Sequence, residues 1–306
     1  MKLFRTLDLP DQFRHGAVSI GNFDGVHRGH ARIVQGLLAM ARQVGGPAVV
    51  FTFDPHPARL LHPEAAPMPL LWPDRKAALL AELGVDAVVA YPTDEAFLRL
   101  SARDFFEQIV SQRLGARAMV EGRNFFFGHG RSGNTEVLRQ YCEESGIGIE
   151  VVAPLEVDGQ MVSSSCIRKM VSAGRVEEAR AKLGRPHRIR GSVIRGAGRG
   201  RRLGFPTANL GHVDTLLPGE GIYAGRVLTD ATAYPAAVSI GPNPTFGEGG
   251  LKIEAYLIGY QGSLYDRVVE LDFLARLRDI KQFDSADHLV AAMHRDVETT
   301  LRMNSE

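Results

Sequence analysis

The spacing of apolar residues predicts an alternation of strands and helices from residue 16 to about residue 184. Short apolar runs typical of buried strands alternate there with segments whose apolar residues recur at helical spacing. The predicted strands are 17–23, 48–53, 86–91, 116–120 and 148–152, and the predicted helices are 31–43, 74–83, 102–113, 134–145 and one that opens at 162–168 and continues to about 183. This alternation predicts a parallel sheet covered by helices, with ligands at the carboxyl ends of its strands.

A different pattern begins at residues 185–190. Long helical patterns stop there, and short alternating segments separated by Gly and Pro turns continue to about residue 283. They predict a small antiparallel barrel or sandwich, followed by a helix from Ser285 to about Arg302. The sequence therefore predicts an α/β domain over residues 1–184 and a β domain over residues 185–306, each long enough for its own core.

Composition narrows the class of protein. The 306 residues are 44% hydrophobic and 23% charged, which predicts folded domains, and the formal net charge of +1 favours neither nucleic acid nor a membrane as a partner. No apolar run reaches the roughly 18 residues that a transmembrane helix needs. The first 16 residues lack the apolar core of a signal peptide, and Cys142 and Cys166 have no metal-ligand or CxxC spacing. We therefore expect a cytoplasmic protein.

The strongest chemical signal is the segment SIGNFDGVHRGH at residues 19–30, where a predicted strand turns into a helix. Gly25 and Gly29 permit a tight turn and the close approach of a ligand. His27 and His30 lie on one side of the first helical turn, beside N–H groups and a dipole that suit a polyphosphate. Two imidazoles can stabilise the charge that develops when a nucleophile attacks an α-phosphate. The alternative is a pair of histidines that cap a helix on a surface turn.

Two loops that follow other predicted strands carry ring side chains. In FTFDPHP at residues 51–57, two prolines stiffen the loop that holds His56, although a plain polar turn would look similar. In EGRNFFFGHGR at residues 121–131, one or two of the three consecutive aromatics can pack inward while another offers a flat face to an aromatic ligand. Core packing alone is the alternative for this loop.

The segment VSSSCIR at residues 162–168 places hydroxyl groups and Arg168 at the start of a predicted helix. Such hydroxyls are ordinary N-caps. Together with the arginine they would also bind a triphosphate at the helix N-terminus.

The second half contains GSVIRGAGRGRRLGFPTANL at residues 191–210. Its glycines suit a loop that wraps a phosphate, while its arginines equally suggest RNA; the neutral composition and the lack of interleaved exposed aromatics disfavour RNA. Thr207 and Asn209 carry the oxygen donors that Mg²⁺ prefers. In the alternating strand 252–258, Glu254 could accept a proton from a substrate hydroxyl, although a lone strand glutamate usually faces solvent.

These motifs resemble those of the bacterial bifunctional riboflavin kinase/FAD synthetases, and the resemblance covers nearly the whole chain. Residues 19–30 are similar to the nucleotidyltransferase motif of the HxGH superfamily, and residues 51–57 and 162–168 resemble the family's FxPHP loop and ISSTxIR segment. Residues 204–209, GFPTAN, match the riboflavin kinase signature. Departures from the family's pattern occur at Asn124, Phe126, Asn134, Ser165, Tyr256, Asp266 and Ile280.

The resemblance implies a Rossmann-like HxGH nucleotidyltransferase domain followed by a small antiparallel β-barrel riboflavin kinase domain with a C-terminal helix. It implies that ATP and Mg²⁺ convert riboflavin to FMN, and that FMN and ATP then give FAD and pyrophosphate. The alternatives are a non-catalytic flavin- or nucleotide-binding paralogue and an enzyme active in only one module. Riboflavin, FMN and ATP are the expected partners, and weak self-association is left open.

The same resemblance implies the roles of individual residues. The catalytic residues would be His27, His30 and Glu254, the ATP-binding residues Gly21, Phe23, Asp24, Gly29, Ser164, Ser165, Arg168, Gly200, Thr207 and Asn209, the flavin-binding residues His56, Pro57, Asn124 and Phe127, and the metal ligands Thr207 and Asn209.

Overall fold

The computed structural model describes residues 1–196, 198–229, 232–243 and 248–305. The chain forms two compact units. The first, here the sheet unit, comprises residues 1–67 and 72–163; the second, the barrel unit, comprises 68–71 and 164–306.

The sheet unit is built on six parallel strands in the order β1-β4-β3-β2-β5-β6. The strands are β1 (Lys2–Phe4), β2 (Ala17–Ile20), β3 (Ala48–Phe53), β4 (Ala87–Tyr91), β5 (Ala118–Gly122) and β6 (Gly148–Val152). The helices are α1 (Arg28–Val44), α2 (Ala58–Leu61), α3 (Pro73–Glu82), α4 (Glu95–Leu98), α5 (Ala102–Asp104), which continues as the π-helix η3 (Phe105–Arg113), and α6 (Thr135–Glu144). Three 3₁₀ turns, η1 (Asp11–Phe13), η2 (Pro63–Ala65) and η4 (His129–Arg131), and a hairpin of β7 (Glu156–Val157) and β8 (Gln160–Met161) complete the unit.

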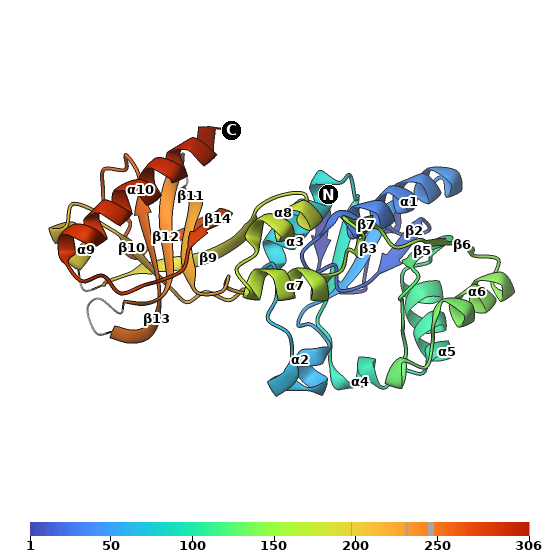
Figure 1. Ribbon diagram of the computed structural model, residues 1–306. Coiled ribbons are helices and arrows are strands. Elements are labelled where there is room, and N and C mark those ends of the chain that lie inside the picture. The colour runs from blue at the N-terminus through green and yellow to red at the C-terminus, as the bar shows by residue number, and fades with distance from the viewer. Residues whose placement is uncertain (197, 230–231, 244–247, 306) are drawn as a thin grey trace. The chain divides into compact units, whose positions relative to one another are not determined.

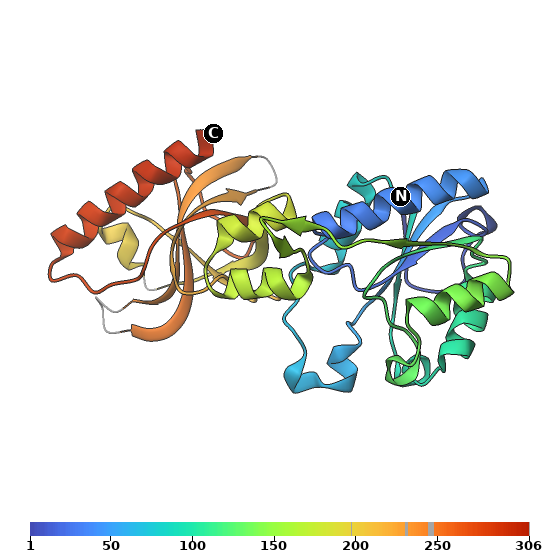
Figure 2. The same ribbon diagram turned by 45° about the vertical axis from the view of Figure 1, so that its right-hand side comes forward.

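The central strands are apolar on both faces because helices cover both sides of the sheet. On one side, Val18, Phe51 and other strand residues form a core with η3 and α6. On the other, α1 packs so closely that a Cβ on Gly36 would stand 3.2 Å from Val120 Cγ1. Helix α1 and the pair α5 and α6 accordingly lie on opposite sides of the strands (Figures 1 and 2).

The barrel unit begins with two helices and closes six antiparallel strands into a barrel of order β10-β13-β12-β11-β14-β9. Its elements are α7 (Ser164–Ser172), α8 (Val176–Leu183), β9 (His187–Ile194), α9 (Arg199–Arg202), β10 (Ala208–Gly211), β11 (Gly221–Leu228), β12 (Ala233–Asn243), β13 (Glu248–Leu257), β14 (Val268–Arg278) and α10 (Ala286–Ser305). The predicted combination of a parallel sheet, an antiparallel barrel and a C-terminal helix is confirmed, and the barrel excludes the sandwich.

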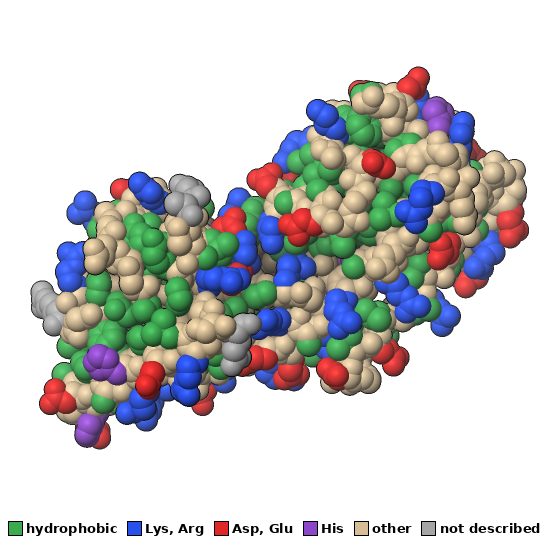
Figure 3. Space-filling model, turned by 90° about the horizontal axis from the view of Figure 1, so that it is seen from above, with side chains coloured by type: hydrophobic (Ala, Val, Ile, Leu, Met, Phe, Trp, Pro, Cys, Tyr) green, Lys and Arg blue, Asp and Glu red, His purple; other side chains and the backbone are tan. Residues whose placement is uncertain are grey.

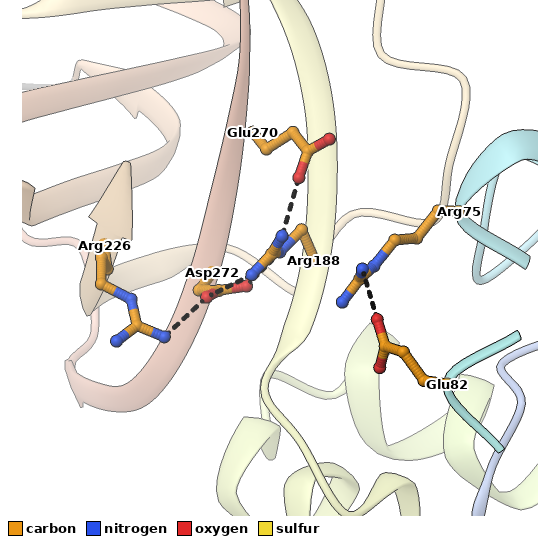
Figure 4. A network of polar contacts seen from close by, with 6 residues as sticks. All are labelled: Arg75, Glu82, Arg188, Arg226, Glu270 and Asp272. Carbon is orange, nitrogen blue, oxygen red and sulfur yellow. Dashed lines mark hydrogen bonds and ion pairs between the residues drawn. The ribbon is translucent and has the colours of Figure 1, made fainter. Parts of the chain in front are cut away.

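Side chains of opposite charge tie the barrel together outside its apolar core. Asp272 on β14 is almost fully buried, and its carboxylate accepts hydrogen bonds from Arg188 on β9 at 2.6 and 2.9 Å and from Arg226 on β11 at 3.0 Å (Figure 4). A buried carboxylate paired in this way is strongly fixed, because removing either partner would leave a charge uncompensated. Helix α10 lies along the barrel (Figure 2). Its Asp296 accepts a hydrogen bond from Arg278 Nη2 at 2.7 Å.

Three local predictions are wrong. The strand predicted over 17–23 ends at Ile20, and the single helix predicted to Leu183 is two helices. The break lies at Gly174, whose φ of 74° belongs to the left-handed region and whose Cβ would meet the Tyr223 hydroxyl at 2.7 Å. The resemblance also implied that GFPTAN ends a strand, whereas its last two residues, Ala208 and Asn209, begin the strand β10. The short elements β1, α2, α4, β7 and β8 were not predicted.

The surface agrees with the neutral composition. Lys and Arg side chains are interspersed with Asp and Glu over the face drawn in Figure 3. Among the residues that the structure describes, no helix is long and apolar enough to cross a membrane.

Candidate active sites in the two units

The turn between β2 and α1 has an unusual backbone. Phe23 and Val26 have φ angles of 46° and 37°, in the left-handed region that bulky and β-branched residues rarely adopt. Both side chains are buried, and Gly25 between them has a φ of 83°. Because strained conformations persist only where the surroundings hold them, this turn must be held from outside.

His27 ends the turn as the N-cap of α1. Its Nδ1 accepts a hydrogen bond from the His30 backbone N–H at 3.2 Å. The neutral ring therefore carries its proton on Nε2, which can donate to a ligand. Capping and ligand binding, the two alternatives for this histidine, are thus compatible.

Gly29 makes room for the imidazole of His27. A Cβ on Gly29 would stand 3.1 Å from the Nδ1 and Cε1 atoms of that ring. His27 and His30 stack with their centroids 3.6 Å apart, and Phe23 lies 5.0 Å from the His30 ring. The structure therefore brings both histidines together at the amino end of α1, with Gly21, Phe23, Asp24 and Gly29 in the same turn.

Two titratable groups that the sequence did not single out, the half-buried Lys76 and the buried Glu121, hold this turn. Lys76 on α3 donates from Nζ to the Asn22 carbonyl at 2.8 Å and to Thr52 Oγ1 at 3.3 Å. Burial lowers the pKa of Lys76, and the carboxylates of Asp24 and Asp54 act against that shift. No local sequence pattern distinguishes this lysine from one on the solvent face of α3.

The second group is Glu121 at the end of β5. The ladder between β2 and β5 includes only Ala17 and Val18, and beyond it Glu121 Oε1 accepts from the Ile20 N–H at 2.7 Å. Burial raises the pKa of Glu121 well above its ordinary value, opposed by that hydrogen bond. The strands part here because the sheet order reverses direction between β2 and β5, the place where open parallel sheets bind ligands.

The loops after β3 and β5 end at the same edge of the sheet. His56 accepts from the Ala58 N–H at 3.0 Å through Nδ1, and Pro57 is the N-cap residue of α2. After β5, Phe127 is buried and stacks on Phe125 at 5.4 Å.

Phe126 is the exposed ring of that loop. It is 45% exposed, and the Arg131 guanidinium lies 4.2 Å from its ring centroid. Asn124 is also exposed. The structure therefore divides the three aromatics between core and surface, as the sequence suggested, with Phe126 offering the flat face.

Ser164, Ser165 and Arg168 lie at the start of α7, in the barrel unit. Ser165 is exposed, whereas Arg168 Nε donates to the Met68 carbonyl at 3.0 Å. Part of the arginine's donor capacity is thus committed to the chain segment 68–71.

In the barrel unit, Gly200 supports the loop before β10. Its carbonyl accepts from the Phe205 N–H at 2.8 Å, and a Cβ on Gly200 would meet the Phe205 carbonyl oxygen at 2.3 Å. That Cβ would also stand 3.4 Å from Thr207 Oγ1. Only glycine fits this close approach, so the loop geometry that presents Thr207 depends on it.

Asn209 on β10 is paired directly with Glu254 on β13. Directly opposed residues project from the same face, with Cβ atoms about 4.5–5.5 Å apart. Ile253 and Ala255 on either side of Glu254 are buried in the barrel core, so Glu254 and Asn209 face away from it. The structure thus brings together an amide and a carboxylate that lie far apart in the sequence.

An aromatic cluster accompanies this pair, and one of its members was not predicted. Phe205 packs edge-on against Tyr256 at 5.2 Å and against His294 of α10 at 5.0 Å. His294 carries no motif signal, because a single histidine in an amphipathic C-terminal helix is indistinguishable from a surface residue.

Comparisons with known proteins assign a family to each half of the chain. Residues 9–166 match the FAD synthetase family and residues 183–304 match the riboflavin kinase family. A bifunctional riboflavin kinase/FMN adenylyltransferase from Pseudomonas fluorescens is 36% identical over 299 residues, 97% of this chain and 96% of the relative. The protein of that description from Escherichia coli K12 is 34% identical with the same coverage.

One solved structure also matches over nearly the full length. It is a protein from Streptococcus pneumoniae described as a macrolide-efflux protein, with a TM-score of 0.86, 29% identity and 97% coverage of both chains.

Proposed function

The chain belongs to the bifunctional riboflavin kinase/FMN adenylyltransferase family, and we propose that residues 1–184 carry the adenylyl transfer and residues 185–306 the phosphoryl transfer. The enzyme phosphorylates riboflavin with ATP to give FMN, and adenylylates FMN to give FAD and pyrophosphate. The observation that supports the division is that each unit carries its own set of converging polar groups: the stacked histidines at α1 and the Asn209–Glu254 pair on the barrel. The boundary after residue 184 is part of this proposal.

In the adenylyl transfer, a phosphate oxygen of FMN attacks the α-phosphorus of ATP and the bond to the pyrophosphate oxygen breaks. His27 and His30 would donate to the α-phosphate oxygens from Nε2 as negative charge develops on them. Gly21, Phe23, Asp24 and Gly29 would bind ATP, as would Ser164, Ser165 and Arg168. His56, Pro57, Asn124 and Phe127 would bind the flavin; Phe127 is buried in the core, and Phe126 is the exposed ring of its loop. No covalent intermediate is required, because positioning and charge stabilisation suffice.

In the phosphoryl transfer, the ribityl hydroxyl oxygen of riboflavin attacks the γ-phosphorus and ADP leaves. Glu254 would accept the hydroxyl proton as general base. Gly200 would shape the ATP loop, while Thr207 and Asn209 would face the nucleotide.

The side-chain oxygens of Thr207 and Asn209, at the start of β10, fit Mg²⁺. This ion usually takes few protein ligands together with substrate phosphates rather than an all-protein cage. Among the described residues there is no cluster of three or more His, Cys, Asp or Glu that could hold a metal. When bound, Mg²⁺ would neutralise phosphate charge. We propose Thr207 and Asn209 as its protein ligands.

We also propose a cytoplasmic location and weak self-association for the protein.

One assay tests the division. Purified full-length protein is incubated with ATP and Mg²⁺ and either riboflavin or FMN, and the flavins are separated by chromatography. FMN and then FAD should form from riboflavin, and FAD alone from FMN. Flavin binding without turnover would instead select the non-catalytic paralogue, and product from only one substrate would select a single active module.

A further inference from the structure

Lys76 occupies an unusual position for a lysine. The residue is half-buried on α3, and its ammonium group is desolvated enough to lower its pKa. Lysine is rarely withdrawn from water, because the charge loses hydration that its new partners must replace. Its hydrogen-bond acceptors here are neutral, the Asn22 carbonyl and the Thr52 hydroxyl, with Asp24 and Asp54 acting through space.

Lys76 Nζ, Thr52 Oγ1 and the Asn22 carbonyl are hydrogen-bonded to one another near the ends of β2 and β3. Thr52 Oγ1 donates to the Asn22 carbonyl at 3.1 Å and accepts from Lys76 Nζ at 3.3 Å, while that nitrogen also donates to the same carbonyl. Asn22 lies just beyond β2, where the ladder to β3 ends at Ile20 and Phe51. Lys76 thus continues the support of the turn beyond the reach of backbone pairing.

The held segment is the one that carries the proposed adenylyl-transfer groups. Asn22 is followed by Phe23, whose φ of 46° needs outside support. The side-chain Oδ1 of Asn22 is itself buried, with no hydrogen-bond partner among the described residues. A buried polar atom of this kind calls for a ligand or an ordered water.

We propose that Lys76 is a positioning residue for adenylyl transfer: through the Asn22 carbonyl and Thr52 it fixes the β2–α1 turn so that Asn22 Oδ1 and the His27 ring meet the nucleotide. This inference rests on the adenylyl transfer assigned to the sheet unit. Stability alone does not explain the lysine, because replacing a desolvated charge by an apolar side chain of similar volume is often neutral or stabilising.

The test measures activity and stability separately in the full-length chain. Lys76→Met keeps the side-chain length but removes the charge and both hydrogen bonds. We expect kcat for FAD synthesis from FMN to fall by about 10²-fold, the effect of a small misplacement of reacting groups. The thermal midpoint should stay level or rise, and FMN formation from riboflavin should not change.

Matched variants make the outcome decisive. Arg75→Met alters the neighbouring residue of α3, whose Nη1 lies 3.4 Å from Glu82, and should leave FAD synthesis unchanged. Lys76→Gln retains a hydrogen-bond donor, so its kcat should lie between the values for the parent and for Lys76→Met. The proposal is overturned if Lys76→Met keeps kcat within about twofold, or if the Met and Gln variants both fail to fold, which would make the role structural. A parent protein that forms no FAD would refute the proposed function instead.

Discussion

Asn209 and Glu254 lie directly opposite each other on β10 and β13, 45 positions apart in the chain (254 − 209) and on the face of the barrel turned away from its core. The GFPTAN signature and the alternating strand around Glu254 are separate signals in the sequence. The antiparallel register of β10 and β13 places the two residues side by side. This pairing supports assigning both residues to a single chemical step.

Glu254→Gln tests the proton acceptor of that step. Glutamine keeps the size and the hydrogen-bonding capacity but cannot accept the proton, so phosphorylation of riboflavin should fall by about 10²–10⁴. FAD synthesis from supplied FMN should be unchanged. Separate assays with riboflavin and FMN as starting substrates measure both effects, and unimpaired FMN production would show that another group is the base.

Substitution of Thr207 or Asn209, the proposed oxygen ligands of Mg²⁺, should have a different effect. Thr207→Ala or Asn209→Ala should weaken productive binding of Mg-ATP, so that the loss of FMN formation is largest at low nucleotide concentration. The measurement is the dependence of the initial rate on ATP concentration at saturating riboflavin. A fall in rate that is equal at all ATP concentrations would contradict a binding role.

The observed capping role of His27 and its proposed catalytic role can be separated by substitution. His27→Ala removes both the helix cap and Nε2, and should lower FAD synthesis by about a hundredfold or more while costing about 1 kcal/mol of stability. His27→Asn restores a good N-cap acceptor without the imidazole, so it should recover the stability and not the activity. Thermal unfolding and the rate of FAD formation from FMN provide the two readouts. Recovery of activity in His27→Asn would reduce His27 to a capping residue.

Most of the fold could be predicted because each strand type has its own pattern. The strands of the parallel sheet are buried on both faces and read as apolar runs, whereas a barrel strand such as β9 alternates buried and less buried positions. The short elements β1, α2 and α4 span only three or four residues and so carry no periodicity. The break at Gly174 was not predicted, and a single helix was expected there, since a glycine inside a helix is tolerated.

The sequence could indicate the candidate site where its residues lie close together in the chain. His27, Gly29 and His30 form one turn, so their spacing carries the signal. Lys76 and Glu121 were missed because burial by distant elements, and not their neighbours in the sequence, gives them their roles. Lys76 sits in the segment PDRKAALLAE, where a lysine is typical of a solvent-facing position.

The barrel unit should need α7 and α8 in order to fold well. Val176 of α8 is fully buried in the barrel core, the Val171 carbonyl accepts from the Gly219 N–H at 3.0 Å, and Glu177 accepts from the Arg276 N–H at 3.0 Å. A fragment of residues 164–306 should therefore be more stable than one of residues 185–306, by about 2.5–6 kcal/mol for the lost burial of one valine against the core and the loss of two hydrogen bonds. Urea unfolding of the two fragments compares them. Equal stability would place α7 and α8 outside the barrel's folding unit.

Glu121 should make the stability of the sheet unit depend on pH. Burial raises the pKa of its carboxyl group in the folded chain above the ordinary value of 4.5, so the folded state retains a proton that the unfolded state has lost. The stabilisation is fully present below pH 4.5 and is lost as pH rises through the raised pKa, at about 1.4 kcal/mol per pH unit between the two pKa values.

Glu121→Gln keeps an oxygen that accepts from the Ile20 N–H but does not titrate. The variant should therefore gain stability relative to the parent as pH rises from 5 to 8, a range we choose to lie above the ordinary pKa. Thermal midpoints of both proteins across that range measure the difference, with Glu136→Gln on the nearby exposed surface of α6 as a control that should track the parent. A constant difference between Glu121→Gln and the parent would show that Glu121 does not titrate anomalously and that its hydrogen bond to Ile20 alone accounts for its place at the strand end.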